Sequence, residues 1–195
     1  MNAPCRFALT VLVLLCACVT NRYRNEDALA SKSLEFQLNE KGRVDQIEYH
    51  IAPAGVPEAV RAAMTRLHPD GTITGAEKEW HHGTLYYELT SKKDGRETEV
   101  MFYPDGTVFR SEIEVPVDDV PQSIQKVAAA ALPGAEVTKY EEIREADGRL
   151  IEYHVKLSRD GKRYKLLLHR TGVFRGLLRE IPAEVEVPAE AEFEK

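Results

Sequence analysis

Cysteine is nearly missing from this chain of 195 residues, since Cys5, Cys16 and Cys18 are its only copies and all lie near the N-terminus. Everything after Cys18 therefore lacks the thiols needed for a disulfide, for cysteine catalysis or for a thiolate-bound metal. A domain without disulfides has to draw its stability mainly from its hydrophobic core.

Clustered positive charge is also missing. Lys and Arg number 26 against 32 Asp and Glu, which leaves a formal net charge of −6 at pH 7. Nucleic-acid binding depends on Lys and Arg that neutralise phosphates, so no nucleic acid is expected as a partner. The rest of the composition, 43% hydrophobic and 30% charged, is that of an ordinary globular protein.

Motifs for catalysis are absent from the sequence as well. The chain has no Gly-x-Ser-x-Gly nucleophile elbow and no glycine-rich phosphate loop. Carboxylates are plentiful, but none stands with a recognisable catalytic partner. We therefore expect no enzyme activity and no cofactor.

An almost wholly apolar run covers residues 7–17 and follows Arg6. It is shorter than the roughly 20 residues that a membrane-spanning helix needs, but it suits the apolar region of a signal peptide. The run leads into Leu15-Cys16-Ala17-Cys18, which resembles a bacterial lipobox. This resemblance implies cleavage before Cys18 and a diacylglycerol group on its sulfur; the alternative is a plain secreted protein with incidental cysteines. The residue after Cys18 is Val19 and not Asp, which in a lipoprotein of this kind implies a location at the outer membrane, facing the periplasm or the cell surface.

Strands are predicted where apolar residues alternate with polar ones. The clearest stretch is residues 84–109, where Asp94-Gly95 and Asp105-Gly106 separate three alternating segments. Asp-Gly favours tight hairpin turns because it accepts positive φ angles. An N-terminal hairpin is predicted over residues 33–51, with a bulge between Val44 and Ile47 where the alternation slips.

Two helices are predicted, and each is opened by a Val-Pro pair. Proline suits the first helical turn because the backbone N–H that it lacks would have no partner within the helix at that position. Apolar residues follow each pair at the spacing of one helical face: Val60, Met64 and Leu67 after Val56-Pro57, and Ile124, Ala128 and Ala131 after Val120-Pro121.

The second half of the chain repeats the first. Val120-Pro121 follows Val56-Pro57 by 64 positions, and Asp160-Gly161 follows Asp94-Gly95 by 66 positions. We therefore predict an α+β fold of two tandem units, each with one helix and a four-stranded antiparallel sheet, after an N-terminal β-hairpin. The predicted division is 1–17 signal peptide, 18–32 lipidated Cys and flexible tether, 33–118 hairpin and first unit, 119–183 second unit, and 184–195 acidic tail.

This order of elements resembles the PepSY-like family, also described as β-lactamase-inhibitor-protein-like (BLIP-like). The resemblance is carried by Ala76-Glu77-Lys78-Glu79, Tyr87-Glu88-Leu89, Asp94-Gly95 and Asp105-Gly106, and in the second unit by Tyr140-Glu141-Glu142, Tyr153-His154-Val155, Asp160-Gly161 and Gly172. The second unit departs from the pattern at His169-Arg170-Thr171-Gly172, where the acidic turn residue is missing. The resemblance implies non-catalytic envelope proteins, secreted or lipid-anchored, some of which inhibit enzymes through an open sheet face.

Alternation in residues 84–109 places Tyr87 and Phe102 under the helix and leaves other large side chains on the opposite face of the sheet. Aromatic residues and Met are enriched at protein interfaces. We therefore predict a partner-binding surface that is made of Tyr86, Met101, Tyr103 and Trp80. The alternative is that this face packs against the other unit or against the N-terminal hairpin.

Two sets of residues suggest a metal site, but neither is predicted to bind one. His81-His82 lie near His68 and Glu79 in the sequence, yet adjacent residues of a strand point to opposite sides, so an exposed turn is the favoured interpretation. Calcium loops need several oxygens at alternating positions, whereas these turns offer one carboxylate each: Asp94, Asp105 and Asp160.

These observations predict a non-catalytic, lipid-anchored envelope protein that binds an unidentified protein partner, with inhibition or sequestration as the form of that binding. The first alternative is a structural, accessory role in assembly of the cell envelope. A metal-dependent hydrolase is the least favoured alternative.

Overall fold

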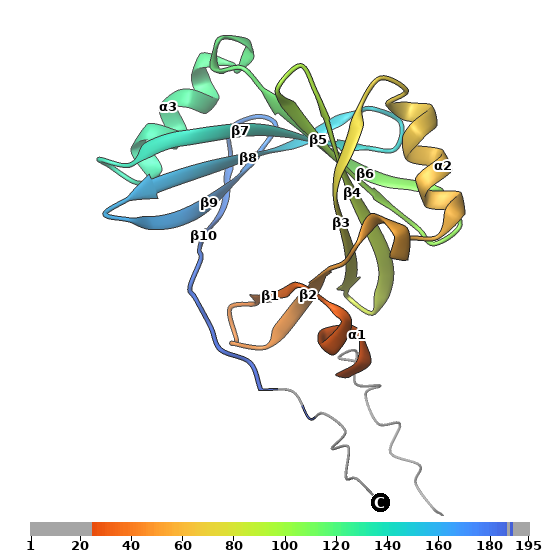
Figure 1. The fold of residues 1–195 in the computed structure, drawn as a ribbon. Helices are drawn as coiled ribbons and strands as arrows, with labels where there is room; N and C mark the ends of the chain where they lie inside the picture. The colour runs from red at the N-terminus through yellow and green to blue at the C-terminus, as the bar shows by residue number, and fades with distance from the viewer. Residues whose placement is uncertain (1–24, 187, 189–195) are drawn as a thin grey trace, which may run out of the picture.

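The computed structural model describes residues 25–186 and 188, and its ten strands form one antiparallel sheet in sequential order (Figure 1). The strands are β1 (Ser33–Leu38), β2 (Val44–His50), β3 (Thr72–His81), β4 (Thr84–Lys93), β5 (Arg96–Phe102), β6 (Val108–Val115), β7 (Glu136–Glu145), β8 (Leu150–Arg159), β9 (Lys162–His169) and β10 (Phe174–Arg179). The α-helices are α1 (Asn25–Ala30), α2 (Glu58–Leu67) and α3 (Gln122–Ala131), and 3₁₀ turns at Pro53–Gly55 and Val117–Asp119 precede α2 and α3. The predicted α+β class is confirmed. The strands after α2 and those after α3 share one sheet, because β6 pairs with β7.

Helices α2 and α3 lie on the same face of this sheet. Val100 on β5 pairs with Ser111 on β6, and Val115, four residues further along β6, pairs with Tyr140 on β7. Paired residues point to the same side of a sheet, as do residues an even number of positions apart. The cores under α2 and α3, which contain Val100 and Tyr140, therefore belong to one face. We call the opposite side the inner face, because the sheet curls around it while α2 and α3 remain outside (Figure 1).

Each of these helices packs an apolar stripe onto the sheet. The stripes are Val60, Ala63 and Met64 in α2, and Ile124 and Ala128 in α3, and all five residues are buried. Phe102 is buried beneath α2 and Tyr87 packs against the same cluster, as predicted. Leu67, the third residue of the predicted stripe, is exposed instead, because α2 ends there. Burying a large apolar side chain contributes about 1.5–3 kcal/mol, so these stripes hold the helices on the sheet.

The hairpin turns differ in type. Asp94 and Gly95 have φ angles of +51° and +82°, and Asp160 and Gly161 have +52° and +70°. Two-residue hairpins of type I′ have positive φ at both central positions, so these turns confirm the prediction. At Asp105-Gly106 only the glycine has positive φ, so this turn depends on glycine rather than on the Asp-Gly pair.

Bulges interrupt the strand pairing at two places that matter for the sites below. Asp45 is an extra residue of β2, because its two neighbours pair with consecutive residues of β1. This confirms the bulge predicted between Val44 and Ile47. Phe109 is likewise an extra residue of β6, since its two neighbours pair with consecutive residues of β5. A bulge changes the direction in which nearby side chains point.

The folded part begins earlier than predicted. Helix α1 lies within residues 18–32, where the prediction is a flexible tether, and Ala28 is buried in a small cluster on β2. Nζ of Lys78 on β3 lies 2.7 Å from Oδ1 of Asp27. The tether prediction is therefore wrong for Asn25–Ala30, whereas the lipidation residue Cys18 lies outside the described residues. Of the helices that the structure describes, none has the length and apolar character to cross a bilayer.

Candidate functional site

The inner face is rich in charged residues although much of it is buried. Strand pairing places these residues on it: Glu48, Glu77, Glu79, Glu88, Glu99, Glu112 and Glu141, with Arg110, Lys139, His154, Lys156 and Lys165. Glu79 is only 1% exposed and Glu141 only 3%. Because α2 and α3 lie on the other face, this burial comes from the curvature of the sheet. The same curvature brings the charge of Lys165 on β9 to act on Glu48 of β2.

Carboxylates dominate the inner face of β2 to β5. Burial, together with the charge of the neighbouring Glu48, raises the pKa of Glu77 and of Glu79 to about 8. Burial and the charge of Glu112 raise the pKa of Glu99 to about 7. At neutral pH Glu77 and Glu79 are therefore mostly protonated and Glu99 about half protonated, which limits the repulsion among these side chains.

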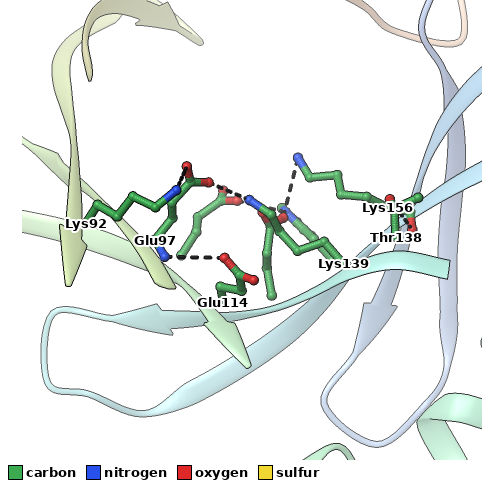
Figure 2. A network of polar contacts seen from close by, with 9 residues as sticks. Lys92, Glu97, Glu114, Thr138, Lys139 and Lys156 are labelled. Carbon is green, nitrogen blue, oxygen red and sulfur yellow. Dashed lines mark hydrogen bonds and ion pairs between the residues drawn. The ribbon is translucent and has the colours of Figure 1, made fainter. Parts of the chain in front are cut away.

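Lysines neutralise carboxylates on the inner face between β5 and β8. Nζ of Lys139 lies 2.8 Å from Oε2 of Glu97 and 3.4 Å from Oε1 of Glu141. Nζ of Lys156 lies 3.4 Å from Oε2 of Glu141. Figure 2 shows these side chains converging from strands on both sides of β6. The network therefore joins the strands that follow α2 to those that follow α3.

Glu112, Glu141 and His154 form a buried group next to this network, with ligand-type atoms within 4.8 Å of one another. Nδ1 of His154 lies 3.3 Å from Oε2 of Glu112. Burial alone would raise the pKa of Glu112, but the charge of His154 holds it well below its usual range. The group is thus an ion pair within a larger set of compensated charges.

Three aromatic rings pack together beside the β5–β6 turn. The ring centroid of Tyr86 lies 5.2 Å from that of Tyr103 and 4.6 Å from that of Phe109. Tyr103 and Phe109 are 5.7 Å apart in an edge-to-face arrangement, and the guanidinium carbon of Arg110 lies 5.4 Å from the centre of the Phe109 ring. Aromatic pairs of this kind contribute about 0.5–1.5 kcal/mol each. We call Tyr86, Tyr103 and Phe109 the aromatic cluster.

The structure separates the four residues that are predicted to bind a partner. Tyr86 and Met101 lie on the inner face, but they are only 7% and 3% exposed. Trp80 lies on the helix side, packed against the small cluster that holds α1. Tyr103 is partly exposed. Of the predicted residues, Tyr103 and Trp80 are therefore partly exposed, and they lie in different places. Phe109, a bulged residue that alternation alone does not reveal, joins Tyr103 in a partly exposed aromatic pair.

His81 and His82 do not point to opposite sides, so the prediction from strand geometry is wrong here. Their rings are stacked with centroids 4.2 Å apart, because His82 adopts a φ of +47° in the β3–β4 turn. Nδ1 of His82 lies 3.3 Å from Oδ1 of Asp45, and ligand atoms of the three residues lie within 4.8 Å of one another. Burial, together with the charges of His82 and Arg110, lowers the pKa of His81.

Oε1 of Glu79 lies 3.6 Å from Nδ1 of His81, whereas the other residues considered as metal ligands lie apart from this group. His68 follows the last residue of α2, close to the start of β3, whereas His81 is the last residue of β3. The backbone N–H of Thr107 donates to Oδ1 of Asp105 at 2.8 Å, which gives that carboxylate a role within its own turn. Asp94 and Asp160 are exposed turn residues. The structure therefore places these carboxylates in separate turns.

No protein-family model matches this chain, and no curated protein matches it in sequence. Solved structures do match. A DUF2874 family protein from Bacteroides uniformis has a TM-score of 0.50 at 20% identity, covering 64% of this chain and 89% of that chain. A candidate periplasmic protein from Bacteroides eggerthii has a TM-score of 0.51 at 17% identity, covering 64% of this chain and 88% of that chain.

A BLIP-like protein from Bacteroides fragilis also matches, with a TM-score of 0.48 at 20% identity over 66% of this chain and 89% of that chain. A structural match at this level of identity shows the fold alone. The resemblance predicted from the sequence motifs is confirmed at the level of the fold by the two matches with TM-scores of 0.50 and 0.51. This chain has the fold of the DUF2874 family protein from Bacteroides uniformis.

Proposed function

We propose that this chain is a non-catalytic, lipid-anchored protein of the bacterial envelope that binds a protein partner through the aromatic cluster. The single observation that carries the proposal is the position of Tyr103 and Phe109. Both are partly exposed, they contact each other, and they lie beside an inner face that is otherwise charged and largely buried. A partly exposed aromatic pair of this kind fits an anchor for a partner surface.

The cluster has the features of an interface hot spot. Buried Tyr86 packs against both partly exposed rings, and the guanidinium of Arg110 lies over the ring of Phe109. Tyr and Arg are among the residues that contribute most to protein interfaces. Rings that are already packed in place lose little conformational freedom on binding, so less of the binding free energy is lost to ordering.

Two observations support an envelope location. The segment that leads into Leu15-Cys16-Ala17-Cys18 has the features of a lipoprotein signal. One structural neighbour is named as a candidate periplasmic protein. Lipidation of Cys18, an outer-membrane location and inhibition or sequestration of the partner are parts of this proposal.

We also propose that residues 33–118 and 119–183 are two tandem units. Helices α2 and α3 each have ten residues and begin 64 positions apart. The bulged residues Thr74 of β3 and Thr138 of β7 are also 64 positions apart. Arg175, the bulged residue of β10, follows Phe109 by 66 positions. Matching bulges in matching strands support duplication, and Arg175 in place of Phe109 assigns the aromatic cluster to the first unit.

Affinity capture from a crosslinked envelope extract tests the proposed site. The bait is the full chain, either unchanged, as the double variant Tyr103→Ala/Phe109→Ala, or as the control Phe174→Ala. Phe174 is an exposed aromatic residue on β10, so the control removes a comparable side chain elsewhere. We expect the unchanged chain and the control to capture the same protein, and the double variant to capture at least tenfold less of it. Equal capture by the double variant would show that the site is wrong, and no capture by any bait would reject the proposed function.

A further inference from the structure

Asp45, His81 and His82 come from two strands and a turn, yet their ligand atoms lie within 4.8 Å of one another. Two imidazoles and one carboxylate are a ligand set that zinc and similar divalent transition metals accept. Ligands about 2.0–2.1 Å from a tetrahedral zinc ion lie about 3.3–3.4 Å from each other. The 3.3 Å between Nδ1 of His82 and Oδ1 of Asp45 fits that separation.

Two local devices produce this convergence. Asp45 is the bulged residue of β2, so its side chain departs from the alternation of its strand. His82 has positive φ, which stacks its ring on that of His81. The backbone N–H of His82 lies 3.5 Å from the carbonyl oxygen of Asp45, so the turn also approaches β2 through the main chain.

A second observation is independent of these three residues. Glu79 is 1% exposed, its Oε1 has no hydrogen-bond partner, and this atom lies 3.6 Å from Nδ1 of His81. Buried polar atoms normally find partners, so an orphaned carboxylate oxygen calls for an explanation. In metal sites a carboxylate commonly accepts a hydrogen bond from a ligating histidine and fixes its orientation. Glu79 is in place for that role.

The buried group of Glu112, Glu141 and His154 is a weaker candidate. Lys139 and Lys156 each lie 3.4 Å from a carboxylate oxygen of Glu141. A divalent ion there would have to compete with two ammonium groups. The Asp45 group also faces one cationic side chain, since the charge of Arg110 reaches His81. No lysine contacts the Asp45 group among the ion pairs of the described residues.

We propose that Asp45, His81 and His82 bind a divalent transition metal of the zinc class, with Glu79 orienting His81. This site is separate from the aromatic cluster and goes beyond the proposed function. His82 is exposed, which gives an ion access from solvent, and Glu79 closes the site from the interior.

Zinc titration of the purified full chain, with metal content measured after dialysis, tests this proposal. We expect about one zinc per chain, at least tenfold weaker binding in Asp45→Asn, His81→Ala and His82→Ala, and unchanged binding in His68→Ala. Co²⁺ bound in place of zinc should give the absorption spectrum of a tetrahedral site, and the first three variants should lack this spectrum. Asp45→Asn preserves the size of the side chain, and His82 is exposed, so we expect Asp45→Asn and His82→Ala to fold. These two variants test the site even if His81→Ala misfolds.

Three results would overturn the proposal. The first is no zinc bound by the unchanged chain. The second is unchanged zinc affinity in both Asp45→Asn and His82→Ala. The third is loss of zinc in His154→Gln with full retention in the Asp45 and His82 variants, which would place the ion in the buried group instead.

Discussion

Nζ of Lys139 on β7 lies 2.8 Å from Oε2 of Glu97 on β5, so an ion pair spans β6 and connects the strands that follow α2 with those that follow α3. Both side chains are less than one-third exposed, and Lys139 also contacts the buried Glu141. Removing one member of a buried charge network leaves the others uncompensated, which costs more than the pair itself contributes.

Lys139→Met should therefore lower the free energy of unfolding by about 2–3 kcal/mol, as measured by urea denaturation. Lys92→Met is the matched control, because Lys92 contacts the same Glu97 at 3.7 Å but is 47% exposed. Exposed ion pairs contribute about 0–1 kcal/mol, so the control should change little. Equal losses in the two variants would contradict the role of Lys139 as the buried link.

Gly106→Ala should destabilise the β5–β6 turn by more than Gly95→Ala. Both glycines have positive φ, +86° and +82°, so each substitution carries the backbone cost of about 1–2 kcal/mol. A Cβ atom on Gly106 would lie 2.6 Å from the carbonyl oxygen of Ala59 in α2, whereas one on Gly95 would meet nothing within 4 Å. The difference between the free energies of unfolding of Gly106→Ala and Gly95→Ala measures the cost of the contact with α2. A difference near zero would show that α2 shifts to make room for the added methyl group.

Stability should fall as pH rises from about 5.5 to 8.5. The pKa of Glu77 is raised to about 8 and that of Glu99 to about 7, so over this range the folded state binds more protons than the unfolded state. When the folded state binds more protons, the free energy of unfolding decreases with pH. His154 acts in the same direction: burial opposes its charge, but Glu112 raises its pKa overall.

The free energy of unfolding, measured by urea denaturation, should be roughly 2–4 kcal/mol lower at about pH 8.5 than at about pH 5.5; this range allows for partial solvent access to the carboxyl groups. The double variant Glu77→Gln/Glu99→Gln removes two of the titrating groups and should show a clearly smaller loss. A flat or rising stability curve for the unchanged chain would contradict the buried, protonated state of the inner-face carboxylates.

Cys18→Ser should release the protein from membranes, because serine cannot form the thioether bond to diacylglycerol. Membrane fractionation and metabolic labelling with a fatty acid are the measurements. Cys16→Ser is the control and should keep both the label and the membrane association. Labelling that persists in Cys18→Ser would reject the lipobox interpretation.

Local sequence patterns predict most of the strands and turns of this fold. Alternation assigns Tyr87 and Phe102 to the helix side, and the slip between Val44 and Ile47 marks the bulge at Asp45. These features depend on neighbours within a few residues, and their physical causes are backbone sterics and the burial of one strand face.

The curvature of the sheet could not be predicted in the same way. Alternation places Tyr86 and Met101 opposite the helices, but it does not say whether that side curls inward and buries them. The curvature that buries them involves strands far apart in the sequence, since β6 pairs with β7 and the charge of Lys165 on β9 reaches Glu48 on β2. Phe109 and the group of Asp45, His81 and His82 were missed for a related reason, since a bulge or a positive φ overrides simple alternation.

Site-specific photo-crosslinking in living cells is the most direct test of binding at the aromatic cluster. A photoreactive amino acid replaces Phe109 in one variant and Phe174 in another, and adducts are compared after irradiation. We predict one discrete protein adduct from position 109 and none from position 174. Absence of an adduct at 109, or the same adducts from both positions, would contradict binding at the aromatic cluster.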